Sequence, residues 1–152
     1  MPNWCEGTLK VRGTLESVRR FMEDGIAWPQ SGLVVKDYNG ELEFSSSSKG
    51  EQWIKGTECH FITCDEYMYF YEGHTLFLHF KAAWNVSASD LKTVCQTYGI
   101  NMKVQSFDRD NACSQIVEIV GGEVVKDEYI DYDDYDWDCP CPTLGGWPDM
   151  EV

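Results

Sequence analysis

Cysteine and histidine side chains gather at one point of the sequence, where a metal site or a nucleophile is the chemistry to consider. Cys59 and His60 are adjacent, and Cys64 completes a C-x4-C spacing. Zinc takes tetrahedral thiolate and imidazole ligands, so Cys139 and Cys141 are the thiols that would complete a four-ligand site. A C-x-C pair seldom chelates one zinc ion well, and a second knuckle of proper spacing is missing. We therefore predict no metal ion and interpret these cysteines as packing residues.

The same cluster is the main candidate for catalysis. Imidazole titrates near neutral pH and can act as a general base, and a Cys–His pair makes a nucleophile. The sequence contains no nucleophile elbow, no glycine-rich phosphate loop and no metal-hydrolase motif. We therefore predict that the protein is not an enzyme and has neither catalytic residues nor a cofactor. The alternative is a small enzyme or ligand-binding domain that uses Cys59, His60 and Cys64.

The segment from Asp127 to Asp138 combines two residue types, since seven of its twelve residues are acidic and four are aromatic. In an extended chain its last three aspartates would face one way, at intervals of about 6.6 Å, and two aromatic rings the other. Such a strip presents anions and flat rings as a nucleic acid does, and it would suit a groove built for a single strand. The competing interpretation is a solvated acidic tail that improves solubility. The predicted partner-binding residues are Asp131, Tyr132, Asp133, Asp134, Tyr135, Asp136, Trp137 and Asp138.

The charge of the chain is strongly negative. It has 26 acidic residues against 12 basic ones, a net charge of −14 at pH 7. A phosphate backbone would be repelled by such a chain, so we predict no direct nucleic-acid binding. Residues 127–152 hold nine of the acidic residues and none of the basic ones. This shift divides the chain into an α+β domain, residues 1–126, and an acidic, aromatic, Pro/Gly-containing C-terminal segment, residues 127–152.

Length and composition favour a folded protein that stays inside a cell. Of the 152 residues, 43% are hydrophobic and 25% are charged, which suits one globular domain. No apolar run reaches the roughly 18 to 20 residues that cross a bilayer. The N-terminus lacks the basic region and the apolar core of a signal peptide. We therefore predict a protein of the host-cell cytoplasm, with no membrane partner and with its seven cysteines reduced.

Two strand–helix units and several hairpins make up the predicted secondary structure. Thr14 and Ser87 are predicted helix N-caps, and Gly25 and Gly99 end the two helices. Asn39-Gly40 is typical of a hairpin turn. Together these patterns indicate an α+β fold of the ferredoxin-like class, with a mainly antiparallel sheet and two helices packed on one face. The predicted strands are residues 8–12, 32–36, 41–45, 75–84, 102–107, 114–120 and 123–129.

Two stretches resemble a known family. The opening Met1-Pro2-Asn3-Trp4-Cys5, followed by the strand 8–12, and the strand end Phe80-Lys81-Ala82-Ala83-Trp84 are similar to the YubB-type ferredoxin-like domain of small phage and plasmid proteins. Asn85-Val86-Ser87 departs from the family, which usually has Ser or Asn followed by prolines there. The resemblance covers about residues 1–25 and 75–126. It implies a ferredoxin-like fold and a mobile-element origin, and it brings no catalytic residues with it.

These observations predict a non-enzymatic phage or mobile-element protein that binds and inhibits a host protein. The expected partner has a basic surface or nucleic-acid channel, as in nucleic-acid-handling defence components, because an acidic protein reaches such a surface by electrostatic steering. The acidic segment would act there as a nucleic-acid mimic. Besides the small enzyme named above, a self-associating structural protein is a third hypothesis.

Overall fold

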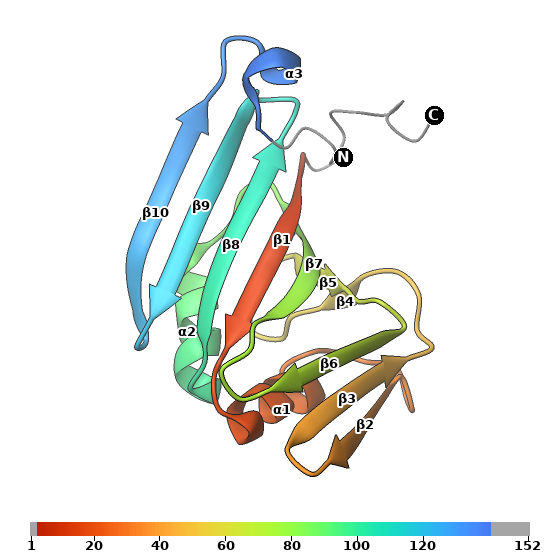
Figure 1. The fold of residues 1–152 in the computed structure, drawn as a ribbon. Helices are drawn as coiled ribbons and strands as arrows, with labels where there is room; N and C mark the ends of the chain where they lie inside the picture. Colours follow the sequence, from red (N-terminus) through yellow and green to blue (C-terminus); the bar gives the residue numbers. More distant parts are fainter. Residues whose placement is uncertain (1–2, 141–152) are drawn as a thin grey trace.

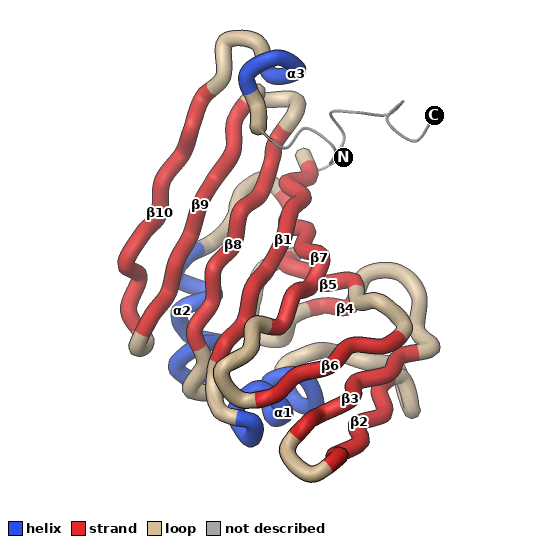
Figure 2. The backbone as a smooth tube through the Cα atoms, viewed as in Figure 1, coloured by secondary structure: helices blue, strands red, loops and turns tan. Residues whose placement is uncertain are grey.

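The computed structural model describes residues 3–140, which form ten strands and three helices (Figure 1, Figure 2). The strands are β1 (Trp4–Arg12), β2 (Leu33–Tyr38), β3 (Glu41–Ser46), β4 (Gln52–Trp53), β5 (His60–Thr63), β6 (Tyr67–Tyr71), β7 (Leu76–Ala83), β8 (Asn101–Asp108), β9 (Cys113–Val120) and β10 (Glu123–Asp131). The helices are α1 (Leu15–Asp24), α2 (Ala88–Tyr98) and the single turn α3 (Tyr135–Asp138). Seven strands pair in the order β10-β9-β8-β1-β7-β5-β4, and β2-β3-β6 form a second sheet.

Strand β1 is the centre of the larger sheet. It pairs antiparallel with β7 on one side and with β8 on the other, so it joins the two halves of the sheet. Its residues alternate as expected for a strand with one covered face, because Leu9 and Val11 are fully buried whereas Lys10 and Arg12 are exposed. At Gly7 the backbones of β1 and β8 come so close that a Cβ would lie 1.7 Å from the Gln105 carbonyl oxygen.

Both predicted helices are confirmed, together with their caps. The Thr14 side chain accepts a hydrogen bond from the Ser17 N–H at the start of α1, and Ser87 accepts one from the Asp90 N–H at the start of α2. Helix α2 ends at Gly99, whose φ of 68° is left-handed. It packs against β8, β9 and β10, and α1 packs against α2. None of the helices in residues 3–140 combines the length and the apolar character needed to cross a membrane.

The smaller sheet begins with the predicted hairpin, which is also confirmed. Asn39 and Gly40 have φ values of 59° and 102°, and such a pair of positive angles suits the tight turn between β2 and β3. Strand β6 adds a third strand to this hairpin by pairing with β3. Leu42, Phe44 and Phe70 are buried from its inner face, so the sheet contributes to the same core as the helices.

The predicted fold class is wrong. The sequence indicated a ferredoxin-like domain in which two helices pack on one sheet, but the described residues form two large antiparallel sheets with few helices. The physical reason lies in residues 52–71, where the three strands β4, β5 and β6 form that the sequence did not predict. The short strands β4 and β5 extend the larger sheet, while β3 and β6 bury alternate side chains from the smaller one. The expected boundary after residue 126 falls inside β10, which pairs with β9 as far as Asp131.

The placement of α2 yields a stability prediction. Leu91 is fully buried between α2 and the sheet, so Leu91→Ala should lower the free energy of unfolding by about 2 to 5 kcal/mol. Urea unfolding followed by circular dichroism measures this change. Thr97→Ala on the exposed side of α2 is the control, and it should change the free energy by less than about 0.5 kcal/mol. Equal effects of the two substitutions would contradict this packing.

Candidate functional site

The C-terminal end of the larger sheet carries the acidic side chains. We call residues 123–138 the acidic edge; they comprise β10, the following turn and α3 (Figure 1). Strand β10 is an end strand whose side chains are all exposed or partly exposed, Val125, Tyr129 and Ile130 among them. On α3 the Trp137 side chain is 86% exposed. The acidic edge therefore presents carboxylates and apolar side chains on one continuous stretch of ordered chain.

The end of this segment is not extended, so the arrangement described for an extended chain does not form there. Residues Tyr135–Asp138 form one helical turn, which Asp134 caps by accepting a hydrogen bond from the Trp137 N–H. The Asp138 N–H donates to the Asp134 carbonyl at 2.7 Å, and the Asp138 carboxylate accepts from the Asp134 N–H at 3.1 Å. Since the turn is helical, its aspartates and rings do not alternate between two sides. Two of the carboxylates are engaged in holding the turn.

Two of the predicted partner-binding tyrosines hold α3 in place. Tyr135 is 7% exposed and packs with Phe107 and Cys139 in a small cluster of its own. Burial raises the pKa of the Tyr135 phenol, and the nearby Cys139 thiol raises it further. Tyr132 packs edge-on against Tyr135, and its hydroxyl group lies 2.9 Å from that of Ser114 on β9. These rings fix the end of the acidic edge on the sheet and are not free for a partner.

The turn between β8 and β9 contacts α3 of the acidic edge and has hydrogen bonds of its own. Buried Asp108 accepts hydrogen bonds from the side-chain amides of Asn3 at 2.6 Å and Asn111 at 2.8 Å. Beside it, Arg109 makes an ion pair with Asp136 of α3 at 3.2 Å. Of the eight predicted residues, the structure thus brings Tyr132, Asp134, Tyr135 and Asp136 into local contacts. Asp138 is likewise engaged, through its hydrogen bonds with Asp134, and Asp131, Asp133 and Trp137 face solvent.

In the Cys59, His60 and Cys64 cluster, the His60 ring is held by hydrogen bonds to the backbone. The His60 ring is buried, with Nδ1–H donating to the Glu58 carbonyl at 2.8 Å and Nε2 accepting from the Ser87 N–H at 2.9 Å. Both ring nitrogens are therefore occupied: the Nδ1 bond is local, and the Nε2 bond joins β5 to the start of α2. Burial lowers the His60 pKa and raises the pKa of the Cys64 thiol to about 12, so this thiol stays protonated at neutral pH.

The cysteines considered for zinc do not come together among the described residues. Cys64 packs against the main core, whereas Cys139 lies in the separate cluster with Phe107. Cys141 lies outside the described residues. Within residues 3–140, no group of three His, Cys, Asp or Glu side chains is placed to hold a metal ion.

One exposed surface was missed in the sequence. We call it the tyrosine face: Tyr38 on β2 and Tyr67, Tyr69 and Tyr71 on β6 project from the outer side of the smaller sheet, each about half exposed. Glu41 and Glu43 lie between them on β3, since each is in register with a β6 tyrosine. The alternation Tyr-Met-Tyr-Phe-Tyr in residues 67–71 is the signal that could have found this face.

Comparisons with protein-family models, with curated proteins and with solved structures find no match to the chain. The resemblance to the YubB-type family therefore stays a prediction, and so does the mobile-element origin that it implies. The surfaces of the molecule itself are therefore the basis for assigning a function.

Tyr135 yields a test of how the acidic edge is held. Tyr135→Ala removes the ring that fixes α3, so the amide protons of Asp138 and Cys139 should exchange with solvent about tenfold faster or more. Hydrogen exchange followed by NMR measures these rates, and amides of β1 should stay protected. Tyr135→Phe keeps the ring and should keep the protection. Unchanged exchange in the alanine variant would show that α3 is held by other contacts.

His60 predicts how stability depends on pH. Its pKa is lowered in the folded state, so the unfolded chain binds a proton first as the pH falls below the ordinary value of 6.5. The free energy of unfolding should then fall with decreasing pH, by up to about 1.4 kcal/mol per pH unit. Urea unfolding between pH 7.5 and 5.5, values that bracket this pKa, measures the slope. His60→Gln should flatten it, and a slope equal to that of the parent protein would assign the effect to another group.

Proposed function

We propose that the protein acts by binding: its acidic edge contacts a basic surface of a partner protein and inhibits that partner, with no reaction of its own. The observation that carries this proposal is the charge of the acidic edge. Residues 123–138 hold eight carboxylates and a single basic residue, Lys126. They lie on a strand and turn that are ordered and open to solvent. Such one-sided charge speeds association with an oppositely charged surface and disfavours other partners.

The anchoring of α3 supports the proposal. Because Tyr135 and the Arg109–Asp136 ion pair hold the turn on the sheet, a partner does not need to order it on binding. Trp137 is presented from this turn with 86% of its side chain exposed. Tryptophan is among the residues that most often dominate the binding energy of an interface. We therefore expect Trp137, and not Tyr135, to be the aromatic anchor.

The partner class that we propose is a nucleic-acid-handling protein of the host, such as a defence component. Adjacent residues of a strand face opposite sides, so Asp127 and Glu128 place a carboxylate on each side of β10, and Asp131 follows at its end. A channel for a single strand combines basic walls with stacking side chains, and it would accept these anions next to an exposed indole. The mobile-element origin that the family resemblance implies suits an inhibitor of host defence.

The tyrosine face supports the same class of function at a second place on the molecule. Tyrosine is enriched in protein interfaces because it offers a large apolar area with a hydroxyl group. Four half-exposed tyrosines on one side of a three-stranded sheet are an unusually aromatic surface for a part of the chain that no helix covers. Two exposed surfaces of this kind suit a protein that acts by binding.

The proposal predicts different effects for charge and for the anchor. Replacing Glu128, Asp131 and Asp133 together by Gln, Asn and Asn should slow association with the partner about tenfold at low salt, because steering is lost. Trp137→Ala should mainly speed dissociation, by about tenfold or more. Affinity purification from a host lysate with the parent chain identifies the partner, and surface plasmon resonance at several salt concentrations then measures both rates.

A matched control removes three charges elsewhere. Glu16→Gln, Glu23→Gln and Asp24→Asn on α1 change the net charge equally but leave the acidic edge intact. If this control slows association as much as the edge variant, net charge and not the acidic edge governs binding, and the proposal is wrong. Truncation after residue 126 is unsuitable as a test, because it would cut β10.

A further inference from the structure

The larger sheet has one face that the helices leave open. In Figure 1, α2 lies behind the sheet, and β8, β1 and β7 cross the front without a helix over them. The side chains on this open face are the exposed members of each alternating strand. They include Lys10 and Arg12 on β1, Phe77 on β7 and Lys103 on β8. This surface is separate from the tyrosine face, and it adjoins the acidic edge, because α3 packs on Phe107 towards the other end of β8 and β10 is the end strand of the same sheet.

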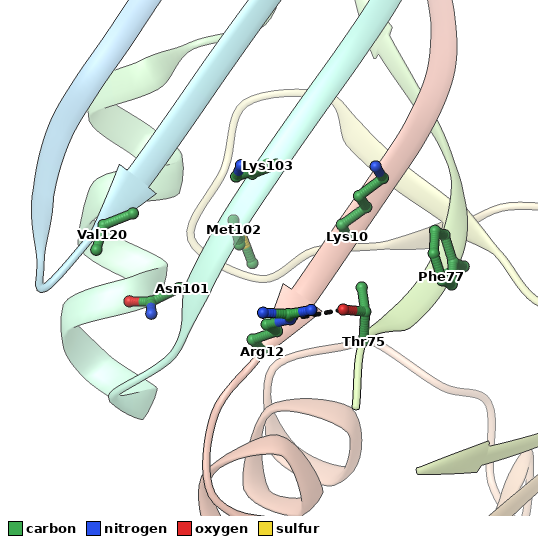
Figure 3. A pocket seen from close by; sticks show the side chains of 8 residues that line it. All are labelled: Lys10, Arg12, Thr75, Phe77, Asn101, Met102, Lys103 and Val120. Atoms are coloured by element: carbon green, nitrogen blue, oxygen red, sulfur yellow. Dashed lines mark hydrogen bonds between the residues drawn. The ribbon is translucent and has the colours of Figure 1, made fainter. Parts of the chain in front are cut away.

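A shallow pocket of about 420 Å³ lies on this open face. Figure 3 shows the side chains of Lys10, Arg12 and Lys103 around it, with Phe77 at one side. The lining contains three of the chain's 12 basic residues and no carboxylate. Its members are Lys10, Arg12, Thr75, Phe77, Asn101, Met102, Lys103 and Val120. In a chain of net charge −14, this is a local concentration of positive charge.

The register of the strands places like charges against one another. Lys10 and Lys103 are directly opposite on β1 and β8, an arrangement that destabilises a sheet. Arg12 follows on the same face of β1, about 6.8 Å further along. Its Nε donates a 2.6 Å hydrogen bond to the Thr75 hydroxyl group, which fixes its orientation. The Glu118 carboxylate, 3.7 Å from the Lys103 ammonium group, offsets part of this positive charge. An anion bound between these cations would relieve the remaining repulsion.

An exposed aromatic ring adjoins the cations. Phe77 on β7 is in register with Lys10 on β1, and its side chain is 56% exposed. The Lys10 ammonium group lies 5.7 Å from the centre of this ring. Cations that hold phosphates beside a ring on which a base can stack are the combination found in proteins that bind single strands. A duplex keeps its bases stacked inside, so it would leave the ring unused.

Beyond the pocket the open face carries further rings and one further cation, together with two carboxylates. Lys81 on β7 is in register with Phe61 on β5, and Phe61 is in register with Trp53 on β4. Lys81 is also opposite Glu6 on β1 and lies 3.9 Å from the Glu51 carboxylate, so its charge is partly offset. The Lys81 ammonium group also lies 4.4 Å from the centre of the Trp4 ring. From β8 to β4 the face spans four strand spacings, which is about 19 Å. This length accommodates a short run of nucleotides.

We propose that the open face of the larger sheet binds single-stranded nucleic acid, with Lys10, Arg12 and Lys103 on the phosphates and Phe77 against a base. The net negative charge argued against nucleic acid in the sequence, but half of it, −7 of −14, belongs to the acidic edge. Strand β10 is three strand spacings from β1, about 14 Å, and two from β8, about 10 Å. At 0.1 M salt, charges more than about 10 Å apart are largely screened.

The experiment measures fluorescence anisotropy of a labelled 12-mer of deoxythymidine with the full chain over a range of salt concentrations. Lys10→Gln with Lys103→Gln should weaken binding about tenfold at low salt. It should also reduce the slope of log K against log salt by about 1.4, since each lost contact to a single strand contributes about 0.7. Lys36→Gln with Lys92→Gln, which lie on β2 and α2, is the matched control and should leave both quantities nearly unchanged.

Variants of the ring separate stacking from charge. Phe77→Ala should weaken binding by about fivefold or more with little change of the salt slope, and Phe77→Leu, which keeps an apolar side chain, should also weaken it. Three results would overturn the proposal: no binding of the 12-mer at low salt, equal effects of the Lys10/Lys103 pair and its control, or equally good displacement of the 12-mer by a glutamate 12-mer peptide. The last result would make the face a site for acidic protein segments.

Discussion

The close approach of β1 and β8 at Gly7 is the constraint on which the larger sheet depends. No side chain could stand at this position, because a Cβ would meet the backbone of Gln105. The contact lets β1 pair along its length with β8 while it also pairs with β7. Every other strand of the larger sheet is attached through them: β9 and β10 with the acidic edge on one side, β5 and β4 on the other. The acidic edge and the open face are therefore both positioned by β1, whereas the tyrosine face belongs to the separate sheet β2-β3-β6.

Local patterns in the sequence predicted local structure well. Thr14 and Ser87 cap helices through hydrogen bonds that span three residues, and Asn39-Gly40 forms a turn from its own backbone preferences. The fold class failed because it depends on pairings that no local pattern specifies. Strand β4 has only two residues, and β6 shows an exposed tyrosine at every second position, so neither has the half-polar pattern from which strands are usually inferred.

The composition of the acidic edge could be predicted from the sequence, but its geometry could not. The sequence identified the acidic and aromatic composition of residues 131–138, and the structure places these residues at the end of the sheet. It could not reveal that Tyr135 is buried, because Phe107, its packing partner, is 28 positions away in the chain. The basic open face was missed for a similar reason. Lys10 and Lys103 are far apart in the sequence and meet only through the β1–β8 register.

The open side of β10 has a consequence for the behaviour of the protein at high concentration. An end strand exposes unpaired backbone N–H and C=O groups, and with Val125 and Tyr129 on its surface it would be a template for a strand of another molecule. Two copies approaching edge to edge would bring two rows of carboxylates together. The same charges that we assign to partner recognition thus keep the sheets of neighbouring molecules from joining into fibrils.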